Sequence, residues 1–330
     1  MQVAFFDTHA YDMPYYKDSP SGHRFTFIEA GLSQDTVPLA RGHEAVCVSI
    51  YDRLEESVLE ALAALDVKLA VVRSSGVELV DFEAAKKHKI TVKWLPGYSP
   101  EAIAEHAVAL VLTLNRKTHL AWQRVCHGDF SIQGLAGFNL YRKIIGIIGM
   151  GRIGYAFARI MKGFGCRLLA HDVQEFENLA AEGIEYTSLE ELLKKSDIIS
   201  LHAALHHSNT CIINRNTLQL MKPGAMLINT ARGGLVDTAA VLTSLKNKQL
   251  GAFGADVYEK ESGIFSHTFK SIEQAGDPLL KELILQPNVL LTAHQAFFTK
   301  EALHQMARTI INELTFYEET FLKPGSGIMV

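Results

Sequence analysis

Residues 144–165, IIGIIGMGRIGYAFARIMKGFG, decide how the middle of this chain folds. The apolar run at 144–148 is typical of a strand that is buried on both faces. The glycine turn at 149–154, G-x-G-x-x-G, is followed by apolar residues at helical spacing, and a second apolar run then ends at Asp172. A buried strand, a glycine turn, a helix and a strand ending in an acid together predict a dinucleotide-binding βαβ unit.

Each glycine of this turn suits one contact with a dinucleotide. Gly149 permits the tight turn, Gly151 lets the backbone approach a pyrophosphate, and Gly154 lets the helix pack close to the strand. The helix N-terminus offers N–H groups to phosphate. Asp172 can accept hydrogen bonds from ribose hydroxyls, and its charge repels the 2′-phosphate of NADP. We therefore predict NAD as the cofactor; the alternative interpretation of the motif alone is an ordinary glycine-rich turn.

The composition places the chain among ordinary globular proteins. With 330 residues, 48% of them hydrophobic and 21% charged, and a net charge of −4, it should form two domains without a basic surface for nucleic acid. No apolar run reaches the roughly 20 residues of a membrane helix, and the N-terminus lacks the basic start of a signal peptide. The four cysteines form no C-x-x-C pair. We expect reduced thiols, no metal site and a cytoplasmic protein.

Strand-like runs alternate with helical patterns along the whole chain, which predicts an α/β fold with two doubly wound, mostly parallel sheets. In the first part, strands are expected at 2–7, 25–29, 45–50, 69–73 and 91–95, and helices at 55–65 and 77–88. Beyond the glycine turn, strands are expected at 197–201, 225–229, 252–257 and 289–292, and helices at 189–195, 214–221 and 238–247.

An apolar helix starting at Pro100 and a helix from Thr299 to about Phe321 mark the domain boundaries. We expect residues 1–99 plus 299–330 to form a flavodoxin-like substrate domain. Residues 100–298 should form a Rossmann NAD-binding domain, with an active-site cleft between the two. His106, in the apolar helix, is expected to be a hydrogen-bonded structural histidine.

Three polar residues follow three of the expected strands of the second domain, namely Arg232, Glu261 and His294. The carboxyl ends of such strands line one edge of the sheet, where doubly wound folds bind ligands. Arginine binds a carboxylate through two parallel hydrogen bonds, and histidine can give a proton to a carbonyl oxygen. A glutamate beside that histidine stabilises the imidazolium. Taken singly, each residue could equally be a surface or structural residue.

Three motifs, NTARG at 229–233, DVYEKE at 256–261 and TAHQAF at 292–297, resemble the signatures of the D-isomer-specific 2-hydroxyacid dehydrogenases. The resemblance is closest to the fermentative D-lactate dehydrogenase branch. It extends over nearly the whole chain and includes PGYSPEAIAEH at 96–106, LNR at 114–116 and GLAGF at 134–138.

The resemblance implies a role for each matching residue. Arg232 would bind the substrate carboxylate, His294 would be the acid–base group, and Glu261, rather than Glu259, would be its partner. Substrate contacts would come from Ser75, Gly76, Tyr98, Arg232 and Phe297, with Phe298 as an alternative to Phe297. The cofactor would be lined by Gly149, Gly151, Arg152, Ile153, Gly154, Asp172, Ala203, Ala204, Asn209, Thr230, Ala231, Arg232, Asp256 and His294.

The activity implied is the reduction of pyruvate to D-lactate by NADH, in a homodimer or homotetramer. Two alternatives stay open: a relative acting on a bulkier 2-keto acid, and a dinucleotide-sensing protein like the family's corepressors. Three positions depart from the family's pattern, because Val173 and Ala204 stand where proline is common and His206 where threonine is frequent. These departures concern the stiffness of the cofactor loops.

Overall fold

The computed structural model describes residues 1–17, 21–95, 97–176 and 178–322. The chain divides into two compact units, one made of Met1–Ser99 and the chain from Phe298 onward, the other of Pro100–Phe297. This division lies one residue from the expected boundary at 298/299. Pro96, part of one of the resembling motifs, lies outside the described residues.

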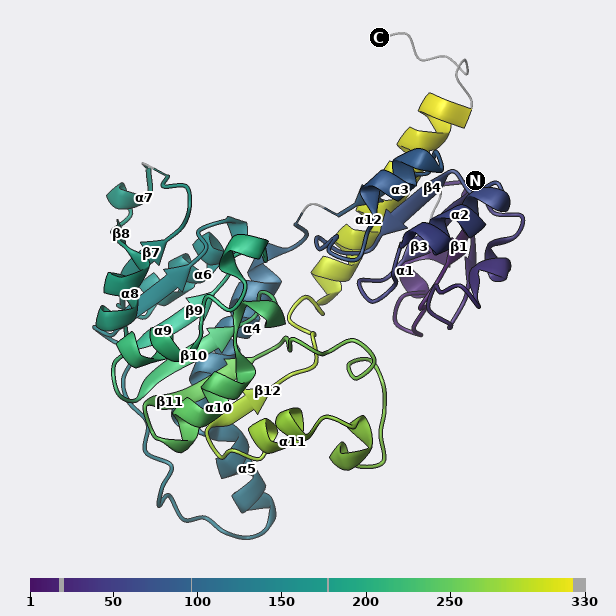
Figure 1. Ribbon diagram of the computed structural model, residues 1–330. Coiled ribbons are helices and arrows are strands. Elements are labelled where there is room, and N and C mark those ends of the chain that lie inside the picture. Colours follow the sequence, from purple (N-terminus) through teal and green to yellow (C-terminus); the bar gives the residue numbers. More distant parts are fainter. Residues whose placement is uncertain (18–20, 96, 177, 323–330) are drawn as a thin grey trace. The chain divides into compact units, whose positions relative to one another are not determined.

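The first unit contains a five-stranded sheet in the order β2-β1-β3-β4-β5, and every pairing between its strands is parallel. This is the flavodoxin-like order, as predicted. The strands are β1 (Gln2–Phe5), β2 (Arg24–Phe27), β3 (Ala45–Val48), β4 (Leu69–Val72) and β5 (Thr91–Trp94). They are short, and β1, β3 and β4 are almost wholly buried, because helices cover both faces of the sheet (Figure 1).

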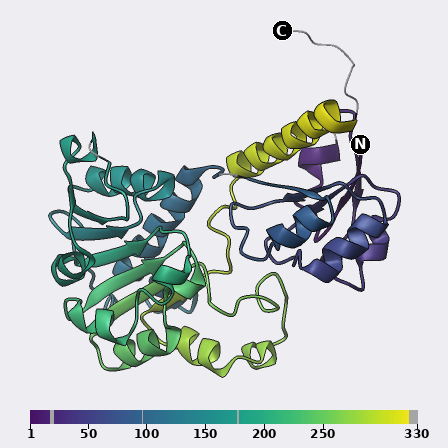
Figure 2. The ribbon, with the colours of Figure 1, turned by 45° about the horizontal axis from the view of Figure 1, so that its top comes forward.

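Helices α2 (Glu56–Ala64) and α3 (Phe82–Lys87) pack on one face of this sheet, where Phe6, Leu59 and Leu62 belong to the same core. Helices α1 (Pro14–Lys17) and α12 (Lys300–Tyr317) pack against each other (Figure 2). Lys93 Nζ, next to the end of β5, lies 3.2 Å from Glu313 Oε2 of α12, and Tyr317 Oη donates to the carbonyl of Lys68 at 3.3 Å. The last long helix therefore completes the first unit.

The second unit contains a seven-stranded parallel sheet in the order β12-β11-β10-β9-β6-β7-β8 (Figure 1). Six of these strands show the Rossmann order, in which the first strand, here β6, lies at the centre. The strands are β6 (Ile144–Ile148), β7 (Arg167–His171), β8 (Ile184–Tyr186), β9 (Ile198–Leu201), β10 (Ala225–Asn229), β11 (Leu250–Ala255) and β12 (Val289–Leu291). The switch point, where consecutive connections run in opposite directions, is between β6 and β9.

Two cores hold the helices to the faces of this sheet. On one face α4 (Pro100–Arg116) and α6 (Arg152–Gly163) contribute Val111 and Phe157. On the other face lie α8 (Leu189–Lys195), α9 (Arg215–Leu220), α10 (Thr238–Lys246) and α11 (Pro278–Ile284). Two further helices, α5 (Thr118–Cys126) and α7 (Asn178–Ala181), complete the unit.

The predicted elements are present, with shifted ends. The helix expected from Val77 begins only at Phe82, because the Asp81 side chain caps it by accepting the N–H of Ala84 at 2.9 Å. The strand expected at 252–257 runs from Leu250 to Ala255. Strand β8 and the helices α1, α5, α7 and α11 were not predicted from the sequence. The segment 263–277, which is irregular apart from a short 3-10 turn at Ile272–Ala275, leads into α11.

Candidate active site

The glycine turn between β6 and α6 has the shape that a dinucleotide requires. Gly149 has a φ of +95°, and a Cβ added there would lie 2.4 Å from the backbone N of Ala203. A Cβ at Gly154 would lie 2.0 Å from the carbonyl oxygen of Gly149, so helix and strand touch at that point. A Cβ at Gly151 would meet nothing within 4 Å. The turn is therefore tight against the protein and open at Gly151, where a pyrophosphate would approach.

Asp172, which follows β7, lies against the same turn. Its Oδ2 accepts the N–H of Met150 at 2.5 Å, and its Oδ1 accepts the N–H of Gln174 at 3.2 Å. A carboxylate has about four acceptor positions, so two positions remain for ribose hydroxyls. The structure brings the predicted ribose-binding acid and the predicted phosphate-binding turn together.

The loop after β9 is held by a side chain that we predicted as a cofactor contact. Asn209 Nδ2 donates to the carbonyl of Ala204 at 2.8 Å, and Asn209 Oδ1 accepts the N–H of His206 at 2.7 Å. These two bonds close the loop around Ala204 and His206, where the family that the sequence resembles more often has proline and threonine. Asn209 thus fixes the conformation of the loop that follows β9.

The loop after β10 carries Arg232 and is fixed by Asn229, which is buried. The side chain of Asn229 donates to the carbonyl of Arg232 at 2.9 Å and accepts the N–H of Ala231 at 3.1 Å. Arg232 Nη1 donates to the carbonyl of Ala231 at 2.8 Å. The hydroxyl of Thr230 is buried and has no hydrogen-bond partner within the described parts of the chain. An unsatisfied buried hydroxyl at a predicted cofactor position fits a site that is completed by a ligand.

The loop after β12 presents His294 with a backbone φ of +52°. Asp256, at the end of β11, is buried and holds this loop through both carboxylate oxygens. Asp256 Oδ1 accepts the N–H of Gln295 at 2.9 Å, and Oδ2 accepts the N–H of Ala296 at 2.7 Å. The backbone N–H of His294 donates to the carbonyl of Asp256 at 2.7 Å. Asp256, predicted to line the cofactor, therefore fixes the conformation of the histidine loop.

His294 and Glu261 form the pair that the sequence predicted. His294 Nδ1 and Glu261 Oε1 are 2.6 Å apart, and Glu261 Oε2 accepts the N–H of Tyr258 at 2.9 Å. Glu259 lies elsewhere, since its Oε2 accepts the hydroxyl of Thr238 at 2.8 Å. The geometry therefore selects Glu261 over Glu259 as the partner of the histidine.

His106 is hydrogen-bonded, as expected of a structural histidine. Its Nε2 lies 2.9 Å from the hydroxyl of Thr292, and that hydroxyl donates to Asp256 Oδ1 at 2.5 Å. The histidine of α4 is thereby tied to the acid that holds the His294 loop. Asn229 and Thr292 were not predicted as site residues; a buried amide at a strand end was the available signal for Asn229.

In the first unit, Ser75 and Gly76 follow β4, and Tyr98 follows β5. Ser75 is exposed and Gly76 is buried. The hydroxyl of Ser74 donates to the carbonyl of Gly76 at 2.7 Å, which fixes the shape of this loop. Phe298 is 47% exposed, and its ring meets that of Tyr11 edge-on with centroids 4.6 Å apart. All of these residues lie at or beyond the carboxyl ends of strands, except Phe298, which precedes α12.

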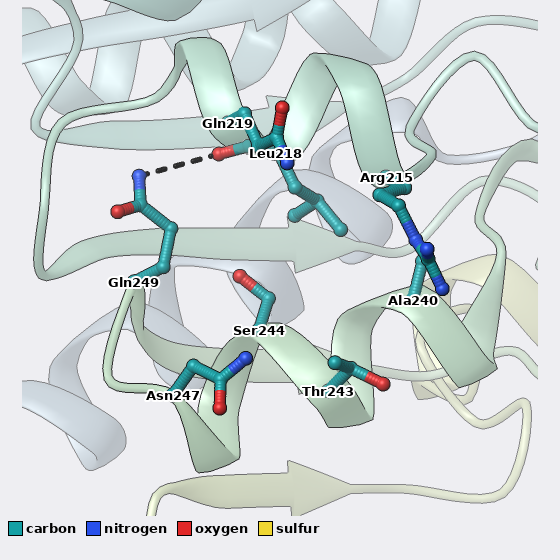
Figure 3. A pocket seen from close by; sticks show the side chains of 8 residues that line it. All are labelled: Arg215, Leu218, Gln219, Ala240, Thr243, Ser244, Asn247 and Gln249. Carbon is teal, nitrogen blue, oxygen red and sulfur yellow. Dashed lines mark hydrogen bonds between the residues drawn. The ribbon is translucent and has the colours of Figure 1, made fainter.

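A cavity of about 510 Å³ lies between α9 and α10, lined by residues such as Arg215, Ser244 and Gln249 (Figure 3). Gln249 Nε2 is bonded to the carbonyls of Leu218 and Met221, at 3.4 and 2.9 Å. None of the predicted site residues lines this cavity, so it is separate from the candidate active site.

The sequence model of the D-isomer specific 2-hydroxyacid dehydrogenases, NAD binding domain, matches residues 108–296. The chain belongs to this family. It is 43% identical over 319 residues to 2-hydroxyacid dehydrogenase A of Aspergillus oryzae, covering 95% of this chain and 91% of that one. It is 40% identical over 321 residues to D-lactate dehydrogenase of Escherichia coli, covering 97% of each.

Among solved structures, one described as the pyruvate reductase of Chlamydomonas reinhardtii matches with a TM-score of 0.90 and 38% identity, over 99% of this chain and 98% of that one. The predictions of the family, of an NAD-dependent oxidoreductase and of the two-sheet α/β fold are thus confirmed. Within the described parts of the chain, no helix is long and apolar enough to cross a membrane.

Proposed function

We propose that this dehydrogenase reduces pyruvate to D-lactate, with Arg232, His294 and Glu261 as its catalytic residues. The observation that carries the proposal is the His294–Glu261 contact at 2.6 Å, on the edge of the sheet that also carries Arg232. The names of the relatives support the choice of substrate, since the Escherichia coli relative is a D-lactate dehydrogenase and the Chlamydomonas structure is described as a pyruvate reductase.

The residues divide the reaction between them. Arg232 binds the carboxylate of the keto acid through its two parallel donors and so orients the carbonyl. The glycine turn and Asp172 would hold NADH, which would supply the hydride when bound. His294 gives its proton to the carbonyl oxygen as negative charge develops there. Glu261 keeps the ring oriented through its contact with Nδ1. Asp256 fixes the backbone from which His294 projects.

The substrate is tested with a panel of 2-keto acids, following NADH oxidation by its absorbance. Tyr98, Phe297 and Phe298 are bulky, and we expect them to leave room for little more than a methyl group. A hydrophobic pocket discriminates each methylene by only about 1–3 kcal/mol. Pyruvate should therefore be favoured modestly over 2-ketobutyrate and strongly over phenylpyruvate in kcat/KM. A preference for phenylpyruvate would place the enzyme with the relatives that act on bulkier acids. Binding of NADH without turnover of any keto acid would favour a dinucleotide sensor.

Cofactor choice depends on Asp172, and the unmutated enzyme should prefer NADH to NADPH. Asp172→Ala removes two charged acceptor positions from the ribose, each hydrogen bond being worth about 1.5–3 kcal/mol. The kcat/KM for NADH should fall about 100-fold or more, and the ratio of kcat/KM for NADH to that for NADPH should become smaller. Glu185→Ala, an exposed acid on the neighbouring strand β8, is the matched control and should change neither value. Equal kcat/KM for both cofactors in the unmutated enzyme would refute this role.

The two glutamates of the segment 259–261 give a second matched pair. Glu261→Gln replaces the carboxylate that contacts His294 Nδ1 by an amide, so a charge-assisted hydrogen bond to the ring is lost. The kcat for pyruvate reduction should fall about tenfold or more, because such a bond is worth about 1.5–3 kcal/mol. Glu259→Gln alters only the hydrogen bonds to the N–H and the hydroxyl of Thr238 and should keep the parental kcat. If the kcat of Glu261→Gln equals that of the parent, Glu261 is not the partner of the acid.

We also propose a homodimer or homotetramer working in the cytoplasm. Helix α5 has no buried residue, and Trp122, Phe130 and Ile132 in and after it are 69%, 77% and 84% exposed. Exposed apolar side chains gathered in one segment favour an interface with another protein surface. The four cysteines are all free, which is consistent with a reducing compartment.

A further inference from the structure

Arg73 is the first residue after β4, and its guanidinium is buried. Nη2 donates to the carbonyls of Phe6 and Asp7, both at 2.8 Å, just beyond the end of β1. Since β3 lies between β1 and β4, the side chain reaches across the carboxyl end of β3. In a sheet of this order the switch point lies between β1 and β3, where flavodoxin-like proteins bind their ligands. In this unit an arginine side chain spans that position.

The charge of Arg73 is balanced inside the protein. Its Nη1 lies 3.5 Å from Asp12 Oδ2, and both side chains are only 7% exposed. The guanidinium carbon lies 4.4 Å from the centre of the Phe5 ring. Burial raises the pKa of Asp12, so the carboxylate is costly to keep ionised. Because a buried ion pair adds little net stability compared with apolar residues of the same size, its presence calls for another role.

The pair joins two loops at the carboxyl edge of the sheet. Arg73 leads directly into the loop of Ser75 and Gly76. On the other side, Asp12 Oδ2 accepts the N–H of His9 at 3.0 Å, which closes the turn that carries Tyr11. The ring of Tyr11 in turn packs against Phe298 (4.6 Å between centroids). One ion pair thus connects two groups of first-unit residues that we expect near the substrate, the Ser75–Gly76 loop and Phe298.

We propose that Arg73 and Asp12 are positioning residues that hold the Ser75–Gly76 loop where it contacts the substrate. This inference rests on the proposed function, which gives that loop its role. Arg73 does not bind the substrate itself, because its buried guanidinium is engaged by Phe6, Asp7 and Asp12. Lysine could not replace this arginine, because Nη2 of the guanidinium donates to two carbonyls while Nη1 faces the carboxylate of Asp12.

The test compares Arg73→Lys, which keeps the charge but loses the fork, with Asp12→Asn, which keeps the size but loses the charge. In both, the KM for pyruvate should rise about tenfold while kcat changes less than about threefold, the pattern of lost substrate binding. The Kd of NADH, measured by fluorescence, should stay unchanged, because the residues assigned to it lie in the second unit. Arg53→Lys, an exposed arginine of the first unit, is the matched control.

A purely structural role would give a different result, in which the folded fraction and kcat fall together and KM stays constant. Circular dichroism and the thermal midpoint report the folded fraction, and if Arg73→Lys does not fold, Asp12→Asn decides alone. An unchanged KM in the folded variants overturns the inference. If the unmutated enzyme prefers another keto acid, the proposed substrate is wrong; the same comparison is then made with that acid.

Discussion

Replacing His294 by alanine is expected to reduce kcat for pyruvate reduction about 1,000-fold or more, the range in which a positioned general acid operates. In the proposed mechanism, the variant loses the group that protonates the carbonyl oxygen, and Glu261, 2.6 Å from the lost Nδ1, loses its partner. D-Lactate oxidation should fall by a similar factor, because the same ring must then accept the proton. NADH should still bind, since the glycine turn and Asp172 are untouched.

The measurement is single-turnover and steady-state reduction of pyruvate, with NADH binding followed by fluorescence in the same preparation. His267→Ala is the matched control, since His267 lies in the irregular segment and contacts the carbonyl of Phe265 (3.1 Å). It should keep the parental kcat. If His294→Ala retains more than about a tenth of the parental kcat, which is above the range for a lost general acid, the proton comes from another group. The assignment of His294 must then be withdrawn.

The sequence predicted the site residues best at positions where the chemistry and the backbone geometry both require the same residue type. Gly149 and Gly154 could be predicted because a side chain at either position would collide with backbone, as the distances of 2.4 and 2.0 Å show. Strands such as β6 and β10 could be predicted because burial on both faces gives unbroken apolar runs. The pairing of His294 with Glu261 could be predicted only when the candidate residues were considered together, because neither residue has a distinctive sequence pattern of its own.

The parts that were missed carry weak local signals. Helix α5 buries no residue, so it has no apolar stripe by which to recognise it. Strand β8 has three residues, which is too short for a period to show. Asp256 was predicted to face the cofactor, and no feature of the sequence indicated that its carboxylate holds the N–H groups of Gln295 and Ala296. Such contacts between side chain and backbone depend on the tertiary structure and produce no periodic pattern in the sequence.

Arg232→Lys is expected to lower kcat/KM for pyruvate about 100-fold, while the Kd of NADH changes little. Lysine keeps the positive charge, so a large decrease in kcat/KM measures the contribution of the two parallel donors of the guanidinium. Losing one charge-assisted bond costs about 1.5–3 kcal/mol, and a misaligned carbonyl adds to that loss. Most of the change should fall on substrates with a carboxylate beside the carbonyl. Arg215→Lys, at the remote cavity between α9 and α10, is the control that should behave as the parent.

The position of Arg232 makes this test specific. Asn229 holds the carbonyl of Arg232 and the N–H of Ala231, so the loop backbone keeps two hydrogen bonds in the variant besides the one from Arg232 Nη1 to the carbonyl of Ala231, which is lost. Gly233 also packs on the backbone of Tyr258, since a Cβ there would lie 2.1 Å from its carbonyl carbon. The lysine variant should therefore keep the conformation of the loop and lose the two parallel donors of the guanidinium. Unchanged KM and kcat in Arg232→Lys would show that the substrate carboxylate binds elsewhere. The second unit would then supply the proton donor His294 but not the residue that binds the carboxylate.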